Sequence, residues 1–116
     1  MSNDAAAKRI MARVTQSESA PIQNTPMAEA SLDFVFNKVW NSKLSWREKR
    51  LISLTCTAIS GHQFPLETHV YAALKSGDLS KDDLHDFALH IAAYAGFPVA
   101  AGVEMMIQKV ASNLKP

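Results

Sequence analysis

The stretch SWREKRLISLTCTAISG, residues 45–61, carries the strongest folding signal in the chain. Ser45 and Glu48 have the spacing of a capping box, in which each side chain accepts a hydrogen bond from the backbone amide of the other residue. The residues that follow are apolar over more than half of a helix circumference, which predicts a central, mostly buried helix that ends near Ser60. Gly61 then permits the chain to reverse, so the next segment is expected to be an antiparallel neighbour.

The rest of the chain is also helical in pattern. Apolar residues recur three and four positions apart, and Ser, Thr, Pro and Gly stand where helices start or end. These signals predict further helices over residues 4–15, 26–40, 65–76, 81–95 and 98–114, and no segment alternates as a strand does. The predicted fold class is therefore all-α, a small antiparallel helical bundle.

The N-terminal part is expected to differ from the rest. Residues 16–25, QSESAPIQNT, are polar, contain a proline and have no helical period, which is typical of a linker or an arm. We therefore predict a helix and linker over residues 1–25 and one helical domain over residues 26–116.

Composition and charge argue against two classes of partner. The net charge of +1 offers no field for nucleic acid. The most apolar segment, residues 91–103, is interrupted by Gly96, Phe97 and Pro98 and falls short of the roughly 20 residues that a membrane span needs. The N-terminal residues contain no apolar stretch long enough for a signal peptide. We expect a cytoplasmic protein that binds neither nucleic acid nor a membrane.

The sequence lacks the residues that thiol redox chemistry and metal binding need. Cys56 is the single cysteine, which excludes a disulfide within the chain and any Cys-x-x-Cys site, and we expect it to be a small buried core residue. The four histidines, at positions 62, 69, 85 and 90, match no metal-binding motif, and the sequence contains no glycine-rich phosphate loop. Neither a metal nor an organic cofactor is expected.

His62 and His69 are the candidate catalytic residues. They lie on either side of Pro65 in the stretch SGHQFPLETHV, residues 60–70, where one helix gives way to the next. His69 follows Leu66 by three residues, which places it on or beside the packed face of its helix. The alternative is that His62 is a loop residue and His69 a core histidine with satisfied hydrogen bonds. Spacing alone leaves both interpretations open.

Three segments resemble the carboxymuconolactone decarboxylase family, which shares its fold with the alkylhydroperoxidase D proteins. They are FVFNKVWNSKLS, residues 34–45, LSWREKRLISLTCTAISGH, residues 44–62, and LETHVYAALKSGDLSKDDLHDFALHIAAYAGFPVAAGVE, residues 66–104. The patterns HxxAALxxG and HIAAYAGFPxA are specific as a set. The resemblance implies an all-α protein of the alkylhydroperoxidase D-like type that forms a homotrimer or homohexamer, with pockets at or near the subunit interfaces.

The resemblance also narrows the chemistry. In the redox-active branch of the family, cysteines stand at the positions of His62 and Pro65, a histidine at the position of His69, and a glutamate at the position of Arg50. Because this chain keeps only the histidine, the resemblance argues against a thiol peroxidase. The decarboxylase branch lacks the cysteine pair and keeps the histidine, although it often carries an arginine where His62 stands.

The leading hypothesis for function is cofactor-independent decarboxylation of a small carboxylated lactone or enolisable acid. Such a site needs a proton donor, an oxyanion donor and a cation that holds a carboxylate. We assign the first two roles to His62 and His69. Arg50 or Arg47 would hold the substrate carboxylate, and Glu104 is a further polar residue of the pocket.

Each of these assignments has an alternative. Arg47 and Arg50 could form a solvated face in the first turn of their helix, and Glu104 could make a subunit or surface contact. For the protein as a whole, the alternative is a non-catalytic oligomer that has lost the redox cysteines and binds a small molecule or a partner.

Overall fold

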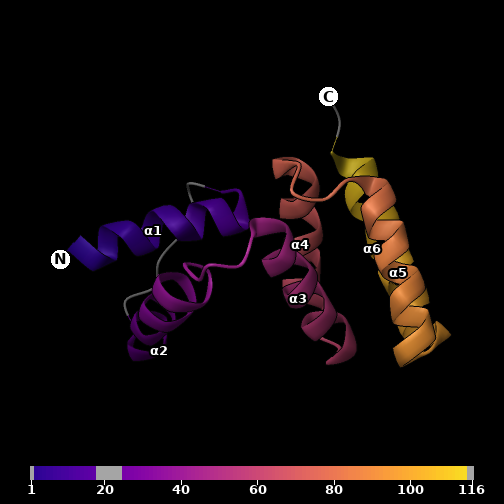
Figure 1. Ribbon diagram of the computed structural model, residues 1–116, viewed down its shortest axis with the longest axis horizontal. Helices are drawn as coiled ribbons and strands as arrows, with labels where there is room; N and C mark the ends of the chain where they lie inside the picture. The colour runs from indigo at the N-terminus through magenta and orange to yellow at the C-terminus, as the bar shows by residue number, and fades with distance from the viewer. Residues whose placement is uncertain (1, 18–24, 115–116) are drawn as a thin grey trace. The chain divides into compact units, whose positions relative to one another are not determined.

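The computed structural model describes residues 2–17 and 25–114, with side chains described from residue 5 onward, and every regular element in these ranges is a helix. The elements are α1 (Ser2–Thr15), α2 (Pro26–Ser31), the π-helix η1 (Leu32–Val39), α3 (Trp46–Ile59), α4 (Gln63–Ser76), α5 (Lys81–Ala95) and α6 (Phe97–Asn113) (Figure 1). The predicted all-α class is confirmed. The chain divides into two compact units, Met1–Leu44 and Ser45–Pro116, which we describe separately.

The first unit contains α1, α2 and η1. α1 packs against η1 and buries Ala7 and Val14. α2 begins as the sequence predicts, because the Thr25 hydroxyl accepts a hydrogen bond from the Ala28 amide and Pro26 occupies the first helical position. Most of the predicted linker, residues 18–24, lies outside the described residues. The predicted domain boundary at residue 25 stays a prediction.

The second unit holds the main hydrophobic core. α5 and α6 lie side by side, and α4 packs against both α3 and α6 (Figure 1). The largest fully buried apolar side chains come from α3, α4, α5, α6 and the loop before α5; they are Leu54, Leu66, Val70, Leu79, Leu84, Val103 and Ile107. Gly61 and Gly77 end two of the helices with φ values of 76° and 81°, so glycine lets the chain reverse at both points.

The segment predicted as one helix over residues 26–40 is divided. It forms α2 and then η1, which closes with a hydrogen bond from the Trp40 amide to the Val35 carbonyl, five residues back, at 2.8 Å. An apolar pattern over eight residues cannot distinguish the wider turn of a π-helix from that of an α-helix, which explains the difference.

α3 is also less buried than its sequence predicts. Leu54 and Ala58 are buried, whereas Ile52 and Ile59 are about half exposed and Cys56 is exposed. The expectation that Cys56 is a core residue is wrong for this chain. The physical reason is that the neighbouring helices cover one stripe of α3, and a helix that is apolar on several sides does not show in its sequence which stripe that is.

None of the helices in the described part of the chain has both the length and the apolar character that a transmembrane span requires.

Candidate functional site

A buried arginine lies at the centre of the candidate site. The Arg50 side chain on α3 is fully buried, and its Nε donates a hydrogen bond of 3.1 Å to the Asp78 carboxylate, which is 10% exposed. Its guanidinium also lies over the Trp46 ring, 5.7 Å from the centroid. The interpretation of Arg50 as part of a solvated first-turn face is therefore wrong, because a buried carboxylate compensates its charge.

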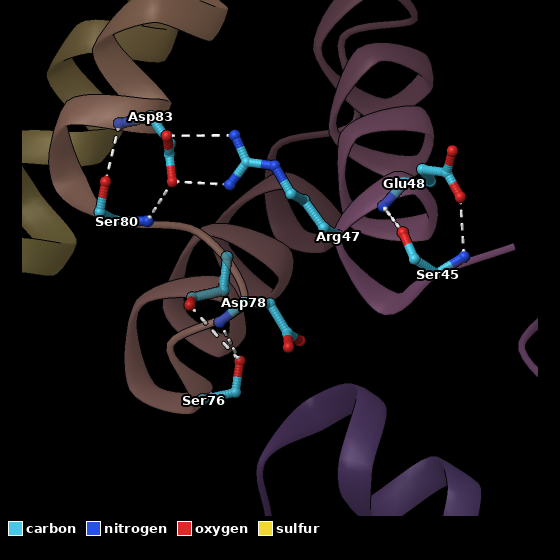
Figure 2. Close-up of polar contacts among 8 residues, drawn as sticks. Ser45, Arg47, Glu48, Ser76, Asp78, Ser80 and Asp83 are labelled. Atoms are coloured by element: carbon cyan, nitrogen blue, oxygen red, sulfur yellow. Dashed lines mark hydrogen bonds and ion pairs between the residues drawn. The ribbon is translucent and has the colours of Figure 1, made fainter.

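Asp78 reaches this position from the turn between α4 and α5. Gly77 ends α4 in the left-handed conformation, and the Asp78 amide then donates to the Ser76 hydroxyl at 3.1 Å (Figure 2). The turn is therefore held by its own side chains, and the carboxylate is directed at Arg50. Sequence reasoning missed Asp78, and the signal that was available is an acidic residue directly after a helix-ending glycine.

His69 is a further partner of Arg50. Arg50 Nη1 lies 3.5 Å from His69 Nδ1, and since a guanidinium can only donate, the ring nitrogen accepts. The remaining ring proton of a neutral His69 is then on Nε2. Burial, followed by the charge of Arg50, lowers the pKa of His69 from 6.5 to about 4. At pH 7 the ring is neutral, and its proton is on Nε2.

His62 is held in the opposite tautomer. It occupies the N-cap position of α4, is exposed, and its Nδ1 lies 2.6 Å from the Ser60 hydroxyl oxygen. That hydroxyl has one proton, which it donates to the Cys56 carbonyl at 2.6 Å. The Ser60 oxygen must therefore accept from His62 Nδ1–H. Nε2 of His62 is left to accept a proton, or to deliver one when the ring is charged.

The two histidines share one side of α4. Seven residues separate them, so they differ by only about 20° around the helix and by about 10 Å along its axis. Pro65 and Leu66 lie between them.

The other predicted residues lie elsewhere. Arg47 is exposed and forms a two-point ion pair with Asp83 at the start of α5, with distances of 2.8 and 3.1 Å (Figure 2). It lies in the first turn of α3, whereas His62 follows the end of that helix, about 20 Å away along the axis. Glu104 on α6 pairs with His85 on α5, whose Nδ1 lies 2.8 Å from Oε1 and 3.0 Å from Oε2. These contacts do not join Arg47 or Glu104 to the histidine pair.

A hollow adjoins His62. It has a volume of about 290 Å³ and lies where the end of α3 meets the starts of α4 and α6. Gly61 and Gln63, which flank His62, are part of its wall, and the rest is mainly apolar, formed by Ala58, Ile59, Leu66, Pro98, Val99, Gly102 and Val103. Neither His62 nor His69 is among the lining residues. Across the ranges 2–17 and 25–114, no group of three His, Cys, Asp or Glu side chains is arranged to hold a metal ion.

Comparison with known proteins gives one match. The sequence model of the carboxymuconolactone decarboxylase family matches residues 25–105. No curated protein and no solved structure gave a significant match. The matched residues include α3, α4 and α5, and with them both candidate histidines, Arg50 and Asp78.

Proposed function

Because the chain belongs to the carboxymuconolactone decarboxylase family, we propose that it is a cofactor-independent decarboxylase, or a related acid–base enzyme, acting on a small carboxylated lactone or enolisable acid. The observation that supports this proposal best is the pair of histidines on one side of α4 with opposite tautomers. His69 offers a hydrogen-bond donor through Nε2, and His62 offers a nitrogen that can carry and release a proton.

The reaction needs both capacities. Loss of carbon dioxide from the γ-carbon of a carboxylated butenolide sends an electron pair through the ring double bond onto the lactone carbonyl. The resulting dienolate is then protonated at its α-carbon. A donor aimed at the developing oxyanion lowers the barrier to the first step, and an acid delivers the proton of the second.

The roles of the two histidines follow from their environments. His69 is neutral at pH 7 because its pKa is about 4, so it acts as an oxyanion donor and not as the acid. His62 is then the proton donor, because its Nε2 becomes a donor when the ring is charged while Nδ1 stays bonded to Ser60. The small hollow beside His62 supplies the apolar surface for the rest of the substrate.

The proposed site also needs a cation that holds the substrate carboxylate. Arg50 is enclosed with Asp78 and His69, so we propose that it acts through His69 and does not hold the substrate. Arg47 of the same chain lies about 20 Å from His62 along α3, much further than a small lactone extends. A cation for the carboxylate is therefore expected from another copy of the chain.

Exposed apolar side chains on α4, α5 and α6 support such an assembly. Phe64, Tyr94 and Phe97 are 82%, 89% and 79% exposed, and surfaces of this kind are usually covered by a partner. We propose a homotrimer or homohexamer, with the site close to a contact between copies.

The proposal is tested by measuring carbon dioxide release from carboxymuconolactone by wild type, His69→Gln and His62→Gln. Loss of an oxyanion donor typically costs about 100- to 1000-fold in kcat, and loss of a positioned acid about 100- to 10,000-fold. His90→Gln is the matched control, because His90 is an exposed histidine on α5 whose Nδ1 contacts the Asp86 carbonyl of its own helix. Unchanged kcat in folded His69→Gln and His62→Gln would refute these roles.

A non-catalytic binding protein is the second candidate function. The hollow beside His62 favours it, since its wall is mainly apolar and needs no chemistry to take up a small ligand. Wild type that binds a non-reactive lactone acid, as measured by calorimetry, but releases no carbon dioxide would favour this function over the decarboxylase.

A further inference from the structure

Three charged or titratable side chains from different elements form one chain of contacts inside the second unit. Asp78 comes from the turn before α5, Arg50 from α3 and His69 from α4. The Asp78 carboxylate binds Arg50 Nε at 3.1 Å, and Arg50 Nη1 faces His69 Nδ1 at 3.5 Å. The guanidinium thus contacts both the carboxylate and the ring.

The guanidinium fixes where the proton of His69 can be. Arginine carries only donors, so a proton on Nδ1 would set two N–H groups against each other in a buried place. At 3.5 Å the hydrogen bond itself is long, but the full positive charge beside Nδ1 acts in the same direction. Both effects move the proton to Nε2.

The Asp78 carboxylate helps to hold Arg50 in this position. A fully buried guanidinium without a counter-charge is strongly unfavourable, and it would turn toward solvent or unfold its surroundings. The carboxylate is 10% exposed and is itself held by the turn, through the bond from its amide to Ser76. The Asp78 carboxylate thus compensates the charge of Arg50.

We propose that Asp78 is a positioning residue, which acts through Arg50 to keep His69 in the Nε2–H tautomer. The inference rests on the proposed function only for what the Nε2–H group does with a substrate. Which ring nitrogen carries the proton is a property of the folded protein, so it can be measured without a substrate.

The test uses the full chain labelled with ¹⁵N-histidine, in two-bond ¹H–¹⁵N spectra at pH 7 that distinguish protonated from unprotonated ring nitrogens. The spectrum of His69→Gln identifies the His69 signals. We expect wild-type His69 to show a protonated Nε2 and an unprotonated Nδ1. A wild-type ring protonated at Nδ1 would overturn the proposal at once.

Two variants test the role of Asp78. Asp78→Asn removes the counter-charge with little change of shape, and we expect His69 to change to a mixture of tautomers. Because this variant removes a counter-charge from a buried cation, the double variant Arg50→Gln, Asp78→Asn removes both charges and is the safer one to fold. It should give the same mixture. A folded variant of either kind that keeps His69 wholly in the Nε2–H form would contradict the proposal.

Asp83→Asn is the control for the spectra. It breaks the other Arg–Asp pair of the second unit, between Arg47 and Asp83, which is more exposed. We expect the His69 signals to keep the wild-type pattern in this variant. A change of tautomer there equal to that in Asp78→Asn would mean that general destabilisation is responsible, and would overturn the specific role of Asp78.

Activity gives a separate readout. If the proposed decarboxylation occurs, folded Asp78→Asn should lower kcat by up to about 100-fold, as when one oxyanion donor is lost, with KM little changed. A tautomer change without any wild-type activity would refute the proposed function and leave the positioning role standing. Activity that is lost with an unchanged tautomer would refute the positioning role.

Discussion

Lowering the pH should destabilise this protein through His69. The pKa of His69 is about 4 in the folded chain, because of burial and then the Arg50 charge, against 6.5 for an ordinary histidine. Between these two values the unfolded chain binds a proton that the folded chain does not. The stabilisation from keeping His69 neutral is thus present above pH 6.5 and is lost as the pH falls from 6.5 toward 4.

The size of the effect follows from the same two pKa values. Over the whole window the difference corresponds to about 3 kcal/mol, and the fall from pH 7 to pH 5 accounts for about 2 kcal/mol of it. The charged group that lowers the pKa of the ring, after burial, is Arg50 on α3, whose Nη1 lies 3.5 Å from Nδ1; Asp78 in the turn before α5 contacts the same guanidinium. The comparison with His69→Gln, which lacks this ring, assigns the loss to His69.

The assay is urea unfolding of wild type and His69→Gln at pH 7 and pH 5, at equal chain concentration because of the expected oligomer. All carboxylates titrate in both proteins, so they cancel when the two pH dependences are subtracted. Wild type should lose about 2 kcal/mol more than the variant. Equal losses in the two proteins, or a ring that titrates near pH 6.5 in the folded chain by NMR, would refute the reasoning.

Two further predictions concern assembly and redox chemistry. The mass by light scattering should be three or six times the 12.7 kDa chain, since large apolar side chains on α4, α5 and α6 are exposed; a folded monomer at micromolar concentration would contradict this. No hydroperoxide should be consumed with any thiol reductant, because the single cysteine has no resolving partner in the chain even though it is exposed. Steady consumption that Cys56→Ser abolishes would contradict the second prediction.

Much of the fold was predictable because its signals are local. The capping box of Ser45 and Glu48 is present with both of its hydrogen bonds, and the helix after it ends at Ile59, as expected. Gly61 and Gly77 mark reversals because the conformations there suit glycine. These features depend on residues three or four positions apart, which a sequence shows directly.

The site was less predictable because its contacts are not local. Arg50 and Asp78 are 28 residues apart, and Arg50 and His69 are 19 apart. Nothing in the spacing of α3 distinguishes Arg50, which is fully buried, from Arg47, which is exposed, because both stand early in the same helix. Which arginine is buried depends on where the turn with Asp78 packs, and that is a property of the tertiary structure.

The positive charge of Arg50 connects the absence of the cysteine pair with the proposed chemistry. In the redox-active branch of the family, the resemblance implies a glutamate at this position. A carboxylate beside Nδ1 would accept a proton from the ring and leave Nε2 as a base, which suits the activation of a thiol. Arg50 reverses this arrangement, because a donor beside Nδ1 makes Nε2–H a hydrogen-bond donor. A chain without the thiol pair has no use for a base at that place, whereas an oxyanion formed by loss of carbon dioxide does require a donor.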